Sequence, residues 1–251
     1  MSSKIKAVLL ATAIAAMVPG THALAADLPV YKAPAPVVDV WNPWMIRLRA
    51  LGVFTRDDGT VDIPGVAIAN PVPGSVLSTS DSVVPELDIS YFFTPNIAVE
   101  LILGVTPHKV SGKELLSGLP VGKTWLLPPT LTLQYHFTNF GAFKPYIGAG
   151  VNYTVFFNTS AANSPAVTPL VGVPLTVTGL DVENTWAPAA QIGFDYMLNR
   201  NVGLNFDVKK LWLRPDWNGS IAVGAGAAPR PMHGEVKLDP WLISAGITYK
   251  F

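Results

Sequence analysis

The sequence predicts an all-β protein, a transmembrane antiparallel up-and-down β-barrel of eight strands with short periplasmic turns and long extracellular loops. Three observations predict this fold. The last eleven residues alternate as a membrane-spanning strand does, seven further segments repeat the alternation, and the chain starts with an export signal but has no later apolar run of about 20 residues. Only 14 % of the residues are charged, which fits a protein with a lipid-facing surface.

The terminal segment, residues 241–251, has a period of two, which is the period of a β-strand. Its apolar face has aromatic rings at both ends and aliphatic side chains between them. Because rings favour the two headgroup levels of a bilayer and aliphatic groups favour its core, we expect this face to contact lipid. The alternative is an edge strand of a soluble sandwich. The apolar face consists of Trp241, Ile243, Ala245, Ile247, Tyr249 and Phe251.

Residues 1–25 have the features of a secretory signal peptide. Lys4 and Lys6 precede an apolar run over residues 7–18, and small residues follow at the positions that a signal peptidase requires. We therefore predict cleavage after Ala25, with the next residue as the alternative.

The remaining chain divides into two predicted parts. Residues 26–43 are rich in proline and are expected to form a periplasmic leader, and residues 44–251 are expected to form the barrel. Eight segments of the second part alternate in the manner of half-buried strands. These segments are residues 44–54, 86–93, 97–105, 130–137, 148–157, 190–196, 202–209 and 241–251.

The connections between these segments alternate in length. Short ones (94–96, 138–144, 198–201) predict turns, and long ones predict loops because they are rich in Gly, Pro, Ser and Thr. Short periplasmic turns and long outer loops are typical of a barrel in the bacterial outer membrane. An even number of strands then places both termini in the periplasm. The predicted loops are residues 55–82, 106–127, 158–185 and 214–239.

Charged side chains are expected inside the predicted barrel near its periplasmic half. In a narrow barrel these groups must pair with one another, because an unpaired buried ion costs several kcal/mol. We expect a structural plug, and the alternative is a role in conducting ions. The predicted plug consists of Arg47, Arg49, Glu86, Asp88, Glu100, Asp195, Asp207, Lys209 and Lys250.

Apolar side chains are expected inside the outer half, where they would form a mouth that admits small hydrophobic molecules. Trp125 and Phe156 are the two aromatic candidates for a ligand contact, although anchoring or packing would also explain them. The other predicted mouth residues are Leu51, Val53, Leu211, Leu213 and Leu242.

Four prolines lie near the outer ends of the even-numbered strands: Pro85, Pro128, Pro129 and Pro188. A proline cannot donate a hydrogen bond to its neighbouring strand and therefore weakens the local pairing. Because a polar plug would block passage through the barrel, we hypothesise a lateral opening into the membrane near these residues. The alternative is that the prolines only end strands where loops begin.

Four segments carry a resemblance to a known family: residues 44–50, 143–150, 191–195 and 205–210. The chain resembles the OmpW family of small outer-membrane barrels from Trp44 to Phe251. The resemblance implies an eight-stranded barrel with a narrow, partly apolar lumen that helps small hydrophobic compounds cross the outer membrane.

The expected partners are outer-membrane lipid, small hydrophobic molecules, and the barrel assembly machinery through the C-terminal strand ending in Phe251. Nucleic acid is not expected, because basic and acidic residues balance at 17 each. With no cysteine and no closely spaced histidines, we predict no metal and no cofactor. An enzyme is not predicted, because no Ser–His pair lies at the lipid-facing rim. A structural or surface-interaction barrel with a plugged lumen, which contacts phage, host or envelope partners, remains the alternative to a conduit.

Overall fold

The computed structural model describes residues 41–55, 61–63, 75–114, 116–169 and 172–251. The predicted signal peptide and most of the predicted leader, up to residue 40, lie outside these ranges. Within the described ranges no helix is long and apolar enough to cross a membrane.

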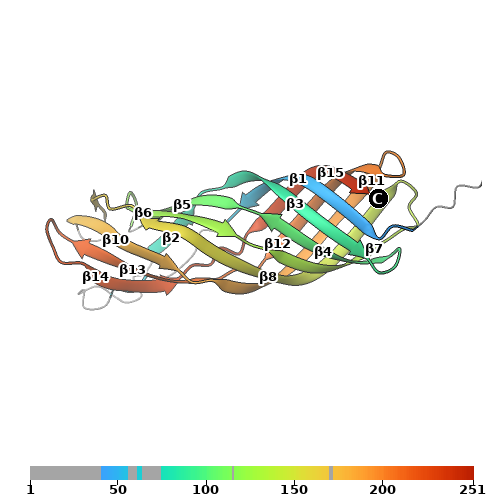
Figure 1. Ribbon diagram of the computed structural model, residues 1–251. Coiled ribbons are helices and arrows are strands. Elements are labelled where there is room, and N and C mark those ends of the chain that lie inside the picture. The colour runs from blue at the N-terminus through green and yellow to red at the C-terminus, as the bar shows by residue number, and fades with distance from the viewer. Residues whose placement is uncertain (1–40, 56–60, 64–74, 115, 170–171) are drawn as a thin grey trace, which may run out of the picture. The chain divides into compact units, whose positions relative to one another are not determined.

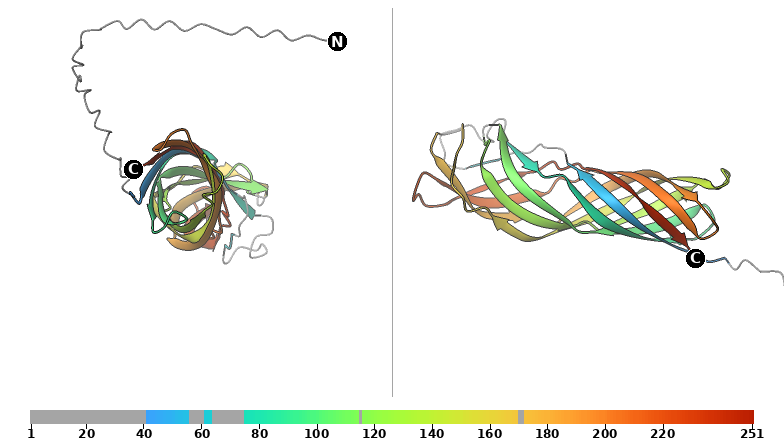
Figure 2. Two further views of the ribbon diagram at one scale, coloured as in Figure 1. Left: turned by 90° about the vertical axis from the view of Figure 1, so that its right-hand side faces the viewer. Right: turned by 90° about the horizontal axis from the view of Figure 1, so that it is seen from above.

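Eight strands close into an antiparallel barrel, which confirms the predicted fold (Figures 1 and 2). Each strand pairs with the next one along the chain, and the last pairs with the first. In this order the strands are β1 (Trp44–Phe54), β3 (Ser82–Phe92), β4 (Ile97–Gly104), β7 (Thr130–His136), β8 (Phe143–Ala161), β11 (Thr185–Met197), β12 (Val202–Leu211) and β15 (Trp241–Lys250).

The outer surface of the barrel follows the alternation of the sequence. Leu48, Leu133 and Ile247 point outward between two levels of aromatic rings, while their neighbours along the strands are buried. At one level the rings of Trp44 and Tyr91 lie 5.0 Å apart, and Tyr135–Phe137 and Tyr249–Phe251 form similar pairs. At the other level Tyr153 and Trp186 lie 4.6 Å apart. This belt of aliphatic groups between aromatic rings matches a bilayer.

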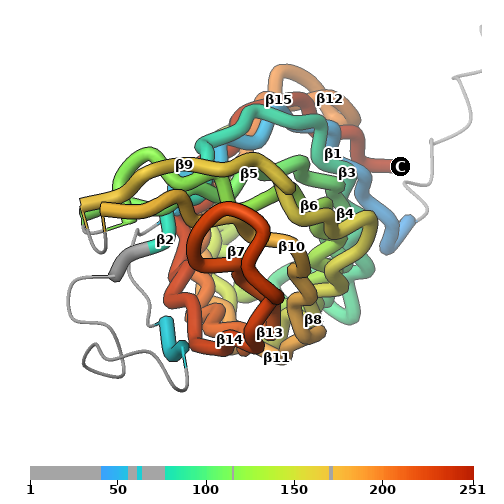
Figure 3. Tube along the Cα trace, turned by 90° about the vertical axis from the view of Figure 1, so that its left-hand side faces the viewer, coloured from blue at the N-terminus to red at the C-terminus, as the bar shows by residue number. Residues whose placement is uncertain are grey.

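The two ends of the barrel differ. At the turn end, short connections join β3 to β4, β7 to β8 and β11 to β12, and the barrel also begins and ends there. At the opposite end, which we call the loop end, the chain continues beyond the aromatic belt as further strands (Figure 3). These are β2 (Ser75–Thr79), β5 (Thr106–Glu114), β6 (Pro120–Leu127), β9 (Ala166–Val167), β10 (Pro174–Val182), β13 (Asp216–Val223) and β14 (Arg230–Glu235).

The loop-end extension corrects the predicted long loops, because each of these four segments contains strands. β2, β5 and β6 join the upper part of β8, and β9, β10, β13 and β14 form a sheet of four. A buried apolar cluster that includes Trp217, Leu175 and Met232 packs this extension. The strands are difficult to recognise in sequence because their exposed faces carry polar and charged residues, such as Lys109, Lys123 and Asn218, in place of an apolar stripe.

Candidate functional site

A network of buried ions fills the barrel between its turn end and its middle. Arg47 donates to both oxygens of Asp195, at 3.0 and 2.7 Å, and also contacts Glu100. Arg49 Nε lies 2.8 Å from Glu86 and 2.7 Å from Asp88. All of these side chains are at most 3 % exposed.

Lys209 extends the network toward the loop end. Its Nζ donates to Glu86 at 3.0 Å and to Asp207 at 2.8 Å. Eight of the nine predicted plug residues therefore belong to one ion-pair network. Opposite charges thus occupy this part of the interior and face one another at contact distance, as buried ions require.

Neutral donors complete this network. Tyr146, which is fully buried, donates from its hydroxyl to Asp207 at 2.9 Å, and Gln134 Nε2 donates to Glu100 at 2.8 Å. Ser90 donates to Glu100 at 2.8 Å, and Thr248 donates to Asp195. The sequence analysis did not assign Tyr146 to the interior.

A small residue opposite Tyr146 makes room for its ring. A Cβ atom added at Gly193 would lie 2.5 Å from the Tyr146 hydroxyl oxygen. Both residues occupy inward-facing positions of their strands. Tyr146 lies two residues before the inward position Gly148, and Gly193 lies two residues after the inward position Gln191. That parity, together with a glycine on the neighbouring strand, is the sequence signal that could have identified the buried tyrosine.

Lys250, the ninth predicted plug residue, is placed differently. Its Nζ lies 5.0 Å from the ring of Phe92 and 5.3 Å from that of Trp41, at the turn end. With Lys144 and Arg200 it lines an open pocket of about 300 Å³ there. Lys250 points inward, as predicted from its strand parity. It is the last residue of β15, however, so its side chain lies at the open turn end of the barrel and not in the ion network.

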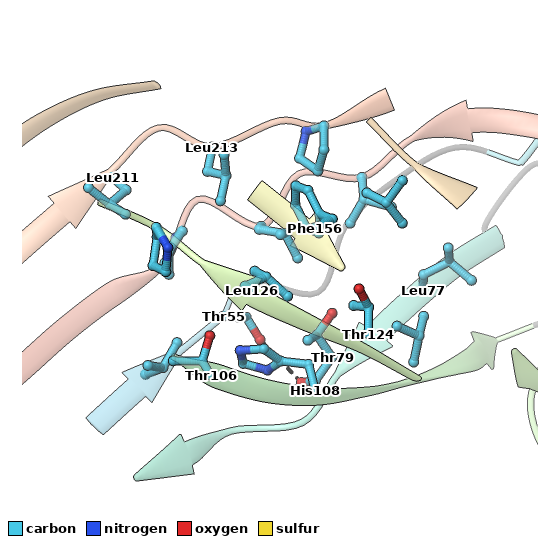
Figure 4. A pocket seen from close by; sticks show the side chains of 18 of the residues that line it. Thr55, Leu77, Thr79, Thr106, His108, Thr124, Leu126, Phe156, Leu211 and Leu213 are labelled. Carbon is cyan, nitrogen blue, oxygen red and sulfur yellow. Dashed lines mark hydrogen bonds between the residues drawn. The ribbon is translucent and has the colours of Figure 1, made fainter. Parts of the chain in front are cut away.

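An apolar cavity of about 80 Å³ lies on the loop-end side of the network (Figure 4). Six of the seven predicted mouth residues line it: Leu51, Val53, Phe156, Leu211, Leu213 and Leu242. Leu77 and Leu126 of the loop-end extension also line it, so the cavity is enclosed by barrel and extension together. These two residues were not predicted, because their segments were expected to form loops.

Trp125 corrects the prediction for the mouth. Its neighbours Thr124 and Leu126 are buried and line the cavity, so the strand period turns Trp125 to the outer face, where its side chain is 39 % exposed. There its ring lies 6.4 Å from that of Phe157.

The barrel wall beside the cavity is interrupted between β3 and β5. Pairing of β3 with β4 ends at Glu86 and Gly104, and pairing of β2 with β5 begins only at Thr79 and Val110. Within the described residues, the backbone bond from Ser80 to Lys109 is the only main-chain hydrogen bond across the intervening stretch. On its other edge the same part of β3 stays paired with β1.

One of the four predicted gate prolines, Pro85, borders this interruption. The Pro85 carbonyl oxygen faces Gly104, so the nitrogen on the same edge, which carries no hydrogen, faces the gap. Pro128 and Pro129 separate β6 from β7 and lie at a different break in pairing, on the opposite edge of β4 and β5. Pro188 does not border the gap, because it pairs with Val151 of β8.

Comparison with known proteins identifies the group to which this barrel belongs. The family model described as "OmpW family" matches residues 44–251. The chain belongs to the OmpW family.

Individual members of this family agree with the assignment. The chain is 51 % identical to an uncharacterized outer-membrane protein, y4mB, of Sinorhizobium fredii, over 91 % of this chain and 90 % of the relative. It is 30 % identical to the dibenzothiophene metabolism operon protein PahQ of Pseudomonas aeruginosa, over 89 % and 95 %. The crystal structure of OprG from Pseudomonas aeruginosa matches with a TM-score of 0.69 at 29 % identity and covers 83 % of this chain and 95 % of that one. The protein is thus a barrel of the bacterial outer membrane.

In this OmpW-family barrel one titratable side chain lines the apolar cavity, His108 of β5. It lies in the loop-end extension, outside the lipid-facing belt, and its Nδ1 is 2.8 Å from the Ser80 carbonyl oxygen. Burial lowers the pKa of His108 below its ordinary value, although the Ser80 carbonyl and the Asp81 carboxylate act in the opposite direction. The imidazole is therefore neutral at pH 7.

His108 also lies where the cavity meets the outer surface. His108 and Thr124 line both the cavity and a groove on the outside of the wall, which Lys109, Lys123 and Trp125 flank. No group of three or more potential metal ligands occurs in the part of the chain that the structure describes. The chemistry available at this site is thus apolar contact with a few hydrogen-bonding groups near His108.

Proposed function

We propose that this protein binds small hydrophobic molecules in the apolar cavity and passes them sideways into the membrane. One observation carries the proposal: the cavity ends on a closed ion network and meets an unpaired stretch of wall between β3 and β5. A hydrophobic molecule gains free energy in such a cavity but loses it beside buried ions. The lateral route is therefore the favourable way out.

We infer that the turn end and both termini of the chain face the periplasm, with the loop end outside the cell. The short connections at one end and the extended strands at the other support this orientation. The C-terminal strand ending in Phe251 would then be available to the barrel assembly machinery in the periplasm.

A relative supports the proposed class of ligand. PahQ is described as a protein of a dibenzothiophene metabolism operon, and dibenzothiophene is a small, apolar aromatic molecule. We therefore assign small hydrophobic molecules, aromatic ones included, as ligands of this chain.

We further infer that the protein is a binder or conduit and not an enzyme. The Ser80 carbonyl engages Nδ1 of His108, and in the described part of the chain no carboxylate hydrogen-bonds to this ring. A nucleophile–base–orienter arrangement needs such a third group. The cavity accordingly lacks the constellation that hydrolysis of a lipid would require.

Binding of a fluorescent hydrophobic probe to the purified protein in detergent tests the cavity. The variants Leu51→Lys, Leu213→Lys and Leu242→Lys each place a charge in it, and Val167→Lys is the matched control on an exposed apolar position of β9. We expect wild type and Val167→Lys to bind the probe saturably and the three cavity variants to lose this binding. All variants should keep a folded barrel that resists heat on gels. Detergent alone provides the background signal.

Unchanged binding in all three cavity variants would contradict the proposal. It would favour a plugged structural barrel whose loop-end extension contacts other surfaces, such as phage, host or envelope partners.

A further inference from the structure

The cavity wall is apolar except for a ring of polar side chains at its side exit. We call this ring the collar; it consists of Thr55, Thr79, Thr106, His108 and Thr124 (Figure 4). The remaining lining comes from leucine, valine, proline, phenylalanine and tryptophan. A site for pure hydrocarbons does not require polar groups in its wall, so the collar points to a ligand with a polar atom.

The hydrogen bonds of the collar differ from one member to the next. The Thr55 hydroxyl donates to the Thr79 carbonyl at 3.2 Å, and the Thr124 hydroxyl lies 2.9 Å from that of Thr159. These two hydroxyls are thus engaged within the protein. His108 is engaged on one ring nitrogen only.

The partner of Nδ1 determines what the other nitrogen of His108 offers. A carbonyl oxygen can only accept a hydrogen bond, so the contact with Ser80 places the hydrogen of the neutral imidazole on Nδ1. Nε2 then carries a lone pair and is an acceptor. Among the residues that the structure describes, none hydrogen-bonds to Nε2.

The surroundings of His108 keep this acceptor neutral and available. Within the described chain no carboxylate lines the cavity, and the nearby Asp81 carboxylate, which favours the imidazolium, is outweighed by burial of the ring. Figure 4 shows the His108 ring between Thr106 and Thr79.

We propose that His108 selects ligands: Nε2 accepts a hydrogen bond from one hydroxyl or N–H group of an otherwise hydrophobic molecule. The preferred class is thus phenols, alcohols and other apolar molecules with a single donor, in preference to hydrocarbons or ethers of the same shape. This inference rests on the proposed function, because it assigns the ligand class of the same cavity. A ligand without a donor leaves Nε2 unpaired on entry, whereas one with a donor restores the bond that Nε2 makes to water.

The test compares 2-naphthol with 2-methoxynaphthalene, two fluorescent ligands of the same ring system that differ in the donor. Both are titrated against wild type, His108→Phe and the control His233→Phe, whose histidine is exposed in β14. The measured quantity is the ratio of the two dissociation constants. Partition of each ligand into detergent is the same for every variant and therefore cancels when ratios are compared.

We expect the preference for 2-naphthol to be about two- to tenfold stronger in wild type than in His108→Phe, and unchanged in His233→Phe. An equal preference in wild type and His108→Phe overturns the role of His108 but leaves the cavity as a hydrophobic site. If neither ligand binds wild type, the proposed function fails as well.

A second measurement needs no substitution and covers the case that His108→Phe does not fold. The side-chain nitrogens of His108 are followed by NMR in ¹⁵N-histidine-labelled protein. We expect 2-naphthol to shift the Nε2 signal and 2-methoxynaphthalene to leave it nearly unchanged. Equal responses to the two ligands would overturn the proposal.

Discussion

Arg47 contacts two carboxylates, Glu100 and Asp195, in the interior of the barrel. If this guanidinium is removed, both buried carboxylates lose their main counter-charge. The energetic consequence is much larger than for an ion pair at the surface, because a lone buried charge has no compensation.

We therefore predict that Arg47→Leu lowers the free energy of unfolding by about 3–5 kcal/mol. Denaturant titration in phospholipid vesicles, followed by tryptophan fluorescence, measures this loss. The control is Arg214→Leu, which disrupts an ion pair with Asp239 whose arginine is half exposed; it should cost only ~0–1 kcal/mol. Equal losses would show that the network contributes no special stability.

His108 provides a residue-scale test of the cavity environment. Because its pKa is lowered by burial, we expect the ring to titrate below pH about 6.5, the ordinary value for histidine. The chemical shifts of the imidazole carbon-bound protons, recorded against pH, measure this. A midpoint at or above that value would mean that water or a counter-ion reaches the ring.

How much of the site could be predicted varies from residue to residue. Strand parity is enough to place Arg47 or Leu51 inside, because a half-buried strand has only two faces. Parity does not give depth, so Lys250 was expected in the plug although it lies at the turn end. Trp125 lies on a strand that was not recognised, so its parity was not known.

At the scale of the elements, the eight membrane strands were recognisable because lipid demands an unbroken apolar face. The strands of the loop-end extension were not, since their exposed faces carry polar and charged residues and lack such an apolar face. What holds the extension together is a compact apolar core around Trp217, which is only 2 % exposed. Such a core depends on contacts between distant segments, which a sequence pattern does not show.

We predict that Trp217→Ala loosens the loop-end extension without opening the barrel. Loss of a buried tryptophan costs about 3–5 kcal/mol, and the β-ladders of the barrel lie outside this core. Limited proteolysis should cut within the loop end, while the barrel keeps its heat-dependent shift on gels. Trp212→Ala, at a half-exposed position, is the control and should resist the protease.

The gap between β3 and β5 gives a second prediction at this scale. Pro85→Ala supplies the backbone N–H that is missing on the edge that faces the gap. We expect slower hydrogen exchange at the flanking amides of Val105 and Thr106, and slower release of a bound probe into lipid vesicles. Release as fast as in wild type, together with slower exchange, would argue against a lateral route here.

At the scale of the whole molecule, we propose that the ion network separates the apolar cavity from the turn end of the barrel. We therefore predict that the reconstituted protein gives no swelling of liposomes in small sugars above the protein-free background. A porin with a wide channel, tested in the same lipid, is the positive control. Swelling that depends on sugar size would contradict the closed interior.

The pairing of β1 with β15 has a consequence for the making of this protein. The seam joins Met45 to Lys250, so the last ladder needs residues from both extremes of the barrel region. A chain interrupted before β15 would leave β1 and β12 with unpaired backbone groups, each of which costs several kcal/mol in hydrocarbon. Only a chain that includes β15 can close the seam, so the complete barrel is stable in the membrane and its fragments are not.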